Sequence, residues 1–300
     1  MPRIYGLGET VLDIIFKEHR PVTSQPGGSA FNALVSLARI GHQVELISEI
    51  GTDQVGRNIL SFLGENGVGT RWVHHFSSGK TPVALAFLDH QNNARYQVYK
   101  DFPDDRFQIE TPDFQNGDVL LFGSFFSVNP VLRPRVKDLL IKAREKGVFL
   151  IYDPNFRKNH LDGIEIYRPI IEENFTLAHM VRGSDEDFQT IYGNITIDEA
   201  LNKVRSGGAH AIITANARGV YALINGHQFF SEARSIDPVS TIGAGDNFNA
   251  GLAHGLVRKG VAQLEVDSWK EIIGWAVDFS TNVCLSMDNY ISYTFAEEVY

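Results

Sequence analysis

The feature that most constrains the fold is a regular alternation of short apolar runs with stretches whose apolar residues recur every three or four positions. The strand-like runs are Ile4–Gly8, Val44–Ser48, Val119–Gly123, Val148–Asp153, Ala178–Arg182 and Ala211–Thr214. The helix-like stretches include Phe31–Ile40, Val131–Lys146 and Ala200–Arg205. Strands that alternate with helices predict crossover connections, and so an α/β fold with a mainly parallel sheet covered by helices on both faces.

Two regions depart from this alternation. Val83–Asp89 and Arg95–Lys100 read as two strands joined by the polar turn His90–Ala94, and Val11–Phe16 has the same character. We predict a small β-sheet lid over a cleft, formed by discontiguous segments about 11–24 and 81–103 of a single domain that covers residues 1–300. An ordinary edge hairpin of the main sheet is the alternative.

A second hairpin is expected near residue 225. Val220–Ile224 and His227–Ser231 flank Asn225-Gly226. This dipeptide suits a type I′ turn, in which both central residues need positive φ.

Composition narrows the class of protein. The 300 residues carry a formal net charge of −9 without a local Lys/Arg cluster, which argues against nucleic acid as a partner. Cys284 is the only cysteine, and we see neither a signal peptide nor an apolar stretch long enough to span a bilayer. We therefore expect a soluble, cytoplasmic protein without a membrane partner.

The strongest local signal is the segment Thr241–Asp246, which precedes a helical pattern. Gly243, Ala244 and Gly245 let a phosphate approach their backbone amides, and the start of the following helix presents further free N–H groups. Asp246 could there accept a proton from an attacking hydroxyl. We also expect the turn to need glycine geometry at Gly245. The alternative is a glycine turn in which the acid only stabilises the helix.

A second glycine segment, Gly27–Asn32, also opens a helix. Paired glycines can turn backbone amides toward a ligand, and Asn32 offers a donor and an acceptor. Upstream, Asp13 could accept hydrogen bonds from neighbouring sugar hydroxyls. Turn chemistry or capping is the alternative for each of these residues.

Together the two segments resemble the signature regions of the ribokinase-like (PfkB) family of carbohydrate kinases. Two further elements match in the same order: Gly51–Gly56 resembles the family's G-x-D-x-x-G stretch, and Asp153–Arg157 resembles the D-P-N-x-R element of its fructokinase and ketodeoxygluconate kinase branches. The ordered set covers nearly the whole chain and is far more specific than any single motif.

The resemblance implies a role for each matching residue. Asp246 would be the catalytic base and Gly243, Ala244 and Gly245 its anion hole, with Asp13, Gly27, Gly28 and Asn32 at the sugar. The nucleotide would lie at Thr214–Gly219, including Asn216, with Ser184 nearby and Asn282 bordering the adenine. Asp187 would help to organise Mg²⁺ beside the phosphates of ATP, which need a hard cation.

Three departures from the family pattern bear on these roles. Ser184 and Asp187 replace an Asn and a Glu, and Asn216 stands at a usual glycine, although Asn tolerates a left-handed backbone. Ser240 replaces an acid that contributes to the monovalent cation site of ribokinase, which leaves activation by potassium in doubt.

The resemblance is closest to the fructokinase branch, because Gly8-Glu9 accompanies Asp153–Arg157. The rival substrate is 2-keto-3-deoxygluconate, whose carboxylate Arg157 and Lys100 could bind. Nucleoside kinase, a non-catalytic sugar-binding regulator and a dehydrogenase are further alternatives. The intact Gly-Ala-Gly-Asp opposes the regulator, and Val11 in place of a third glycine opposes the dehydrogenase. Homodimerisation through the lid is one option for assembly.

Overall fold

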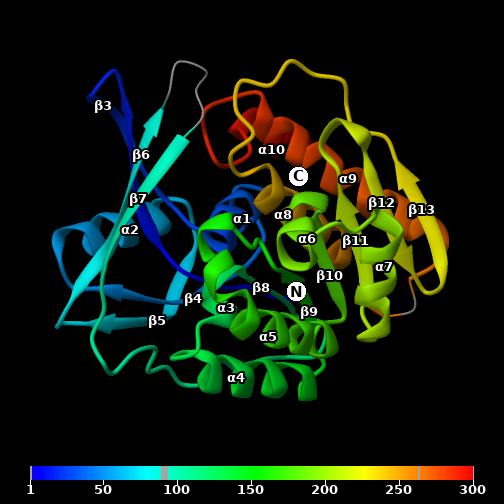
Figure 1. Cartoon of the computed structure of the whole chain (residues 1–300), viewed down its shortest axis with the longest axis horizontal. Helices are drawn as coiled ribbons and strands as arrows, with labels where there is room; N and C mark the ends of the chain where they lie inside the picture. The colour runs from blue at the N-terminus through cyan, green and yellow to red at the C-terminus, as the bar shows by residue number, and fades with distance from the viewer. Residues whose placement is uncertain (1, 89–93, 263, 300) are drawn as a thin grey trace.

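A nine-stranded sheet forms the centre of the computed structural model, which describes residues 2–88, 94–262 and 264–299 (Figure 1). Its strand order is β13-β12-β11-β10-β9-β8-β1-β4-β5. All neighbours pair in parallel except β11 with β12 and β12 with β13. Its strands are β1 (Ile4–Leu7), β4 (Val44–Gly51), β5 (Gly69–Phe76), β8 (Val119–Gly123), β9 (Phe149–Asp153), β10 (Met180–Ser184), β11 (His210–Thr214), β12 (Val220–Ile224) and β13 (His227–Ser231).

Helices cover both faces of this sheet, as predicted. The apolar core on one face draws on α1 (Ser29–Arg39), α2 (Gln54–Glu65), α8 (Ala244–Lys259), α9 (Val266–Cys284) and α10 (Tyr293–Val299). The core on the other face draws on α3 (Ser124–Val128), α4 (Arg133–Glu145), α5 (Ile164–Leu177), α6 (Asp185–Tyr192) and α7 (Ile197–Ser206). The short 3₁₀ helices are η1 (Lys158–Gly163) and η2 (Asn216–Arg218).

The central strands are apolar on both sides because both of their faces are covered. Ile4 belongs to one core and its neighbour Tyr5 to the other, and both are fully buried. The fold class predicted from the alternation is confirmed.

A separate four-stranded sheet stands beside the main sheet, with the order β3-β2-β6-β7 (Figure 1). Its strands are β2 (Val11–Lys17), β3 (Arg20–Gly27), β6 (Lys80–Leu88) and β7 (Ala94–Asp101). The alternative of a hairpin extending the main sheet is therefore wrong. Within the predicted turn His90–Ala94, residues 90–93 lie outside the described residues.

The predicted hairpin between β12 and β13 is confirmed. Asn225 has φ 52° and Gly226 has φ 81°, the positive values that a type I′ turn requires. No helix in the described part of the chain is long and apolar enough to cross a membrane.

Candidate active site

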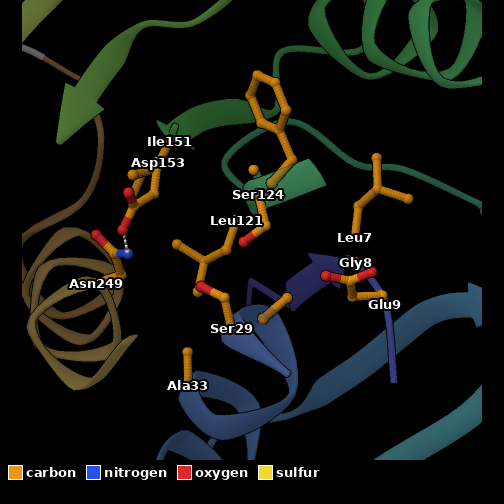
Figure 2. A pocket seen from close by; sticks show the side chains of 13 residues that line it. Leu7, Gly8, Glu9, Ser29, Ala33, Leu121, Ser124, Ile151, Asp153 and Asn249 are labelled. Carbon is orange, nitrogen blue, oxygen red and sulfur yellow. Dashed lines mark hydrogen bonds between the residues drawn. The ribbon is translucent and has the colours of Figure 1, made fainter. Parts of the chain in front are cut away.

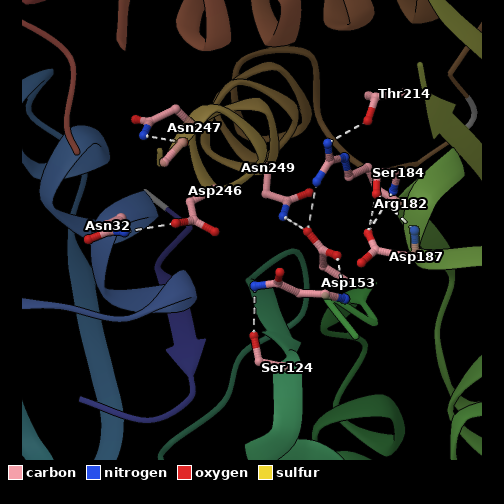
Figure 3. Close-up of polar contacts among 12 residues, drawn as sticks. Asn32, Ser124, Asp153, Arg182, Ser184, Asp187, Thr214, Asp246, Asn247 and Asn249 are labelled. Carbon is pink, nitrogen blue, oxygen red and sulfur yellow. Dashed lines mark hydrogen bonds and ion pairs between the residues drawn. The ribbon is translucent and has the colours of Figure 1, made fainter. Parts of the chain in front are cut away.

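The two glycine segments meet at the starts of α1 and α8. Asn32, in the first turn of α1, donates a hydrogen bond from Nδ2 to Asp246 Oδ2 at 2.7 Å, although the two residues are 214 positions apart (Figure 3). Gly243 precedes α8 as its N-cap with φ 79°. The fold thus brings the predicted sugar segment and the predicted phosphate segment into direct contact.

Asp246 lies in a strongly desolvated position. Burial raises the pKa of its carboxyl group and the charge of Asp153 adds to the rise, while the hydrogen bond from Asn32 and the charge of Arg157 work against it. A carboxylate with a raised pKa is a better proton acceptor near neutral pH. The environment of Asp246 therefore suits general-base chemistry.

A buried ionic network lies next to Asp246 at the ends of β9, β10 and β11. Asp153 Oδ2 accepts hydrogen bonds from Arg182 Nη1 at 2.9 Å and from Asn249 Nδ2 at 2.6 Å, and Arg182 Nη2 donates to Thr214 Oγ1 at 2.6 Å (Figure 3). Arg182 and Asp153 are both buried. The network ties the D-P-N element to the predicted nucleotide stretch and to α8.

Sequence reasoning missed Arg182 and Asn249. From the sequence, Arg182 is only the last residue of a predicted apolar strand. A charged residue at the carboxyl end of a parallel strand often belongs to a binding site, so its position could have indicated one. Asn249 follows Asp246 by three residues on the same helix, a spacing that places both on one face.

The two outer glycines of the anion-hole segment are constrained for different reasons. Gly243 has a left-handed backbone, and a methyl group there would lie 3.0 Å from Asn289 O. Gly245 lies inside α8 without a positive φ, so the expectation that it needs glycine geometry is wrong. Its constraint is space, because a methyl group there would lie 2.6 Å from Arg182 Nη1.

A cavity opens where β1, β8 and β9 end beside the start of α1 (Figure 2). It is lined by Leu7, Gly8, Glu9, Ser29, Ala30, Ala33, Leu121, Phe122, Gly123, Ser124, Ile151, Asp153 and Asn249. At its edge the chain packs tightly, since a methyl group on Gly28 would lie 2.2 Å from Glu9 O. Gly28 has φ 141°, so both its space and its backbone favour glycine.

Asp13 and Gly27 lie on the paired strands β2 and β3 of the small sheet, where Gly27 is opposite Val11 and Asp13 is two residues further along β2. Burial, with a smaller contribution from the charge of Glu9, raises the pKa of Asp13 to about 6. A methyl group on Gly27 would lie 3.1 Å from Asp13 Oδ2 and 3.7 Å from Asn32 Oδ1. Asp13, Gly27 and Asn32, three of the residues predicted to bind the sugar, thus lie close together.

Lys100 and Arg157, the two cations predicted to bind a substrate carboxylate, differ in their ion pairing. Lys100 Nζ, on the small sheet, lies 3.4 Å from Glu9 Oε2, and both side chains are about one-third exposed. The side chain of Arg157 is exposed and makes no hydrogen bond or ion pair with the residues that the structure describes. Its charge nevertheless opposes the rise that burial causes in the pKa of Asp246 and of Asp187.

The predicted nucleotide stretch forms a tight turn after β11. Asn216 has φ 50°, which confirms that Asn tolerates the left-handed backbone expected there. The main chain then reverses at Gly219, which has φ 95°. At the end of α9, Asn282 Oδ1 accepts a hydrogen bond from the backbone N–H of Ser292 at 2.9 Å. The structure gives Asn282 this capping contact, and its place beside an adenine stays a prediction.

Ser184 and Asp187 form a capping box at the start of α6. Asp187 Oδ2 accepts hydrogen bonds from Ser184 N at 2.9 Å and Ser184 Oγ at 2.6 Å. Burial and the charge of Asp153 raise the pKa of Asp187. Among residues 2–88, 94–262 and 264–299, no three His, Cys, Asp or Glu side chains gather as a metal site. In the neighbouring Asp185, which pairs with Arg218 through Oδ2, the buried Oδ1 atom has no hydrogen-bond partner in the part of the chain that the structure describes. This oxygen could accept a hydrogen bond from water around a magnesium ion held mainly by phosphates.

Comparison with known proteins finds a matching family model and relatives of similar sequence. The family model described as pfkB family carbohydrate kinase matches residues 1–279. The fructokinase of Vibrio alginolyticus is 24% identical over 84% of this chain and 83% of its own length. The 2-dehydro-3-deoxygluconokinase of Haemophilus influenzae is 23% identical over 86% of this chain and 88% of its own length.

Two solved structures share the fold. The fructokinase of Vibrio cholerae O395 in its fructose-, ADP- and calcium-bound form has a TM-score of 0.86 at 21% identity and covers 99% of this chain and 98% of its own. The aminoimidazole riboside kinase of Salmonella enterica, complexed with aminoimidazole riboside and an ATP analogue, has a TM-score of 0.81 at 20% identity, with 99% and 98% covered.

Proposed function

Because the chain belongs to the pfkB family of carbohydrate kinases, we propose that it transfers the γ-phosphoryl group of ATP to a hydroxyl group of fructose. The observation that carries the proposal is the 2.7 Å hydrogen bond between Asn32 and Asp246. It joins the segment that would hold the sugar to the segment that would hold the phosphate. Family membership also removes the alternatives of a non-catalytic regulator and a dehydrogenase.

In the proposed mechanism Asp246 takes the proton of the attacking hydroxyl. Its raised pKa supports this role, and Asn32 fixes the carboxylate orientation through Oδ2. The backbone amides at Gly243, Ala244 and Gly245 would stabilise the charge on the transferred group from the N-terminal end of α8. Little covalent chemistry is left for the protein, since phosphoryl transfer depends mainly on positioning and electrostatics.

We propose that ATP lies along Thr214–Gly219 with Mg²⁺ near Asp187. When bound, Mg²⁺ would neutralise phosphate charge while keeping much of its water. Asp187 is held by its capping box, so its carboxylate offers a fixed negative charge at the end of β10.

Fructose is favoured over an acid because the polar groups around Gly27 include a carboxylate and no cation. A substrate carboxylate beside Asp13 would be repelled. In addition, Lys100 is paired with Glu9 and so is partly neutralised. Fructokinases and a 2-dehydro-3-deoxygluconokinase both match the chain over more than four-fifths of its length, so the preference for fructose rests on the charges around Gly27 and Lys100.

The second candidate substrate is 2-keto-3-deoxygluconate. It is supported by the exposed guanidinium of Arg157, which has no ion-pair partner in the described part of the chain. A desolvated Arg–carboxylate pair would make Arg157→Met raise the KM for the acid steeply. For a neutral sugar the same substitution should leave the KM for the sugar within about threefold, since no charge pair is lost.

The test is ATP turnover with a panel of fructose, 2-keto-3-deoxygluconate, ribose and a nucleoside. We expect the highest kcat/KM for fructose, and Asp246→Asn should lower kcat by about 10²–10⁴ without a large change in the KM for ATP. A clear preference for the acid would refute the fructose assignment. Near wild-type turnover by Asp246→Asn would remove Asp246 from the mechanism.

We further propose that the small sheet closes over the sugar as a lid and that two copies associate through it. Three apolar side chains of this sheet support an interface, because Val22, Val98 and Tyr99 are 57%, 42% and 55% exposed. The mass of the protein in solution, compared with that of Val22→Lys, tests the dimer. The single cysteine and the use of ATP support a cytoplasmic location, which stays a prediction.

A further inference from the structure

The segment 289–291, between α9 and α10, lies where the two glycine segments meet. Asn247 Nδ2, in α8, donates a hydrogen bond to Asn289 O at 2.8 Å, and Tyr290 Oη donates to Pro26 O at 2.5 Å. One contact anchors the segment to the phosphate side and the other to the strand that leads into the sugar side.

This segment lies outside the part of the chain that the family model matches, which ends at residue 279. The role of its side chains is inferred from their surroundings.

The side chain of Asn289 reaches the cluster of predicted sugar residues. A methyl group on Gly27 would lie 3.1 Å from Asp13 Oδ2, 3.7 Å from Asn32 Oδ1 and 3.9 Å from Asn289 Nδ2. Polar atoms from three distant parts of the chain thus surround one point, and only the absence of a side chain at Gly27 leaves that point open.

These polar groups have unused hydrogen-bonding capacity. Asn289 and Asn32 are 3% and 4% exposed, and the buried Oδ1 atom of each has no hydrogen-bond partner among the described residues. The side-chain carboxylate of Asp13 makes no hydrogen bond with any residue in the described ranges. Buried polar groups are normally paired, so a cluster of unpaired ones needs a ligand that supplies the missing donors and acceptors.

We infer that Asn289 is a sugar-binding residue that completes the site formed by Asp13 and Asn32. This inference rests on the proposed sugar-kinase function and adds a residue to it. A hydroxyl group of the sugar would donate to Asp13 and accept from Asn289 Nδ2, and a neighbouring hydroxyl would donate to an amide Oδ1. Because the cluster contains one carboxylate, two amides and no cation, it suits a neutral sugar with adjacent hydroxyls.

The experiment measures sugar binding by calorimetry without nucleotide, and separately the KM values for sugar and for ATP. The sugar is the panel member that the wild-type protein binds most tightly. Asn289→Ala should raise the dissociation constant of the sugar about tenfold and leave the KM for ATP within twofold. Asn289→Asp should bind sugar still more weakly at pH 8, because its carboxylate would face that of Asp13.

Tyr290→Phe is the matched control for a purely structural role. It removes the hydrogen bond to Pro26 while it keeps the ring, so it should lower thermal stability and change sugar affinity less than twofold. Wild-type sugar affinity in Asn289→Ala, or an equal loss in Tyr290→Phe, would overturn the inference.

The two proposals fail separately. If the wild-type protein binds another sugar and not fructose, the fructose assignment fails and the Asn289 comparison proceeds with that other sugar. If no sugar of the panel binds, both are overturned.

Discussion

Replacing Gly245 with alanine tests whether steric crowding, rather than backbone conformation, is the reason that this position requires glycine. The added methyl group would lie 2.6 Å from Arg182 Nη1, 3.3 Å from Nη2 and 3.4 Å from Cζ. Arg182 cannot easily yield, because Asp153 holds it at 2.9 Å and Thr214 holds it at 2.6 Å. Either the guanidinium leaves its partners or the first turn of α8 moves.

The magnitude follows from two opposing effects. Alanine in place of a helical glycine gains up to about 1 kcal/mol from helix propensity and the restricted unfolded chain. Forcing a methyl group into a packed site costs about 1–3 kcal/mol, and disturbing a buried ion pair adds to that cost. We therefore expect Gly245→Ala to lower the free energy of unfolding by about 1–2 kcal/mol.

Gly274→Ala is the control. Gly274 lies inside α9, and a methyl group there would meet nothing within 4 Å. It should stabilise the protein by about 0.5–1 kcal/mol. Urea unfolding measures both variants, and kcat should fall about 10- to 100-fold in Gly245→Ala alone, since α8 carries Asp246, the proposed catalytic base. A Gly245→Ala protein that unfolds at the same urea concentration as Gly274→Ala would refute the steric argument.

Two further predictions concern pH. Burial lowers the pKa of His42 to about 4 and of His254 to about 3, whereas an unfolded His titrates near 6.5. Below about pH 6.5 the unfolded state therefore binds more protons than the folded state. The free energy of unfolding should decline as pH falls from about 6.5 to 4, by up to about 2.5 kcal/mol per pH unit. Urea midpoints at pH 5 and 7 measure this, and an unchanged slope in a His42→Gln/His254→Gln variant would contradict it. Because the pKa of Asp13 is about 6, the dissociation constant of the sugar should rise about tenfold between pH 7 and 5 as the carboxylate acceptor is lost. Calorimetry across that range checks it, and a flat profile would exclude Asp13 from the sugar site.

The architecture could be predicted because apolar periodicity reports burial directly. A strand covered on both faces must be apolar throughout, and the runs later assigned to β1, β8 and β9 show that pattern. The strand β3 was not predicted. It contains Pro21 and Pro26, which argue against a central strand but are tolerated at a sheet edge, where β3 lies.

Residues of the candidate site could be predicted only where a short, continuous segment of sequence indicates their chemistry. Asp246 follows glycines and opens a helix, so a short segment indicates an anion site. The roles of Arg182 and Asn289 depend on neighbours far along the chain: Arg182 on Asp153 and Asn289 on Gly27. No spacing in the sequence encodes those contacts.

The side chains of the candidate site carry more negative than positive charge, so they would not bind the phosphates of a nucleotide by themselves. Asp246, Asp153 and Asp187 place three carboxyl groups around the proposed point of phosphoryl transfer. The raised pKa of Asp187 and of Asp246 reflects in part the charge of Asp153. The buried cation there, Arg182, is already committed to Asp153. A polyphosphate would therefore meet net negative charge unless the amides at the start of α8, Arg157 (which has no ion-pair partner within the described ranges) and a bound divalent cation offset it. The same carboxyl groups that would repel the nucleotide alone would attract that cation, so the protein should bind metal and nucleotide together.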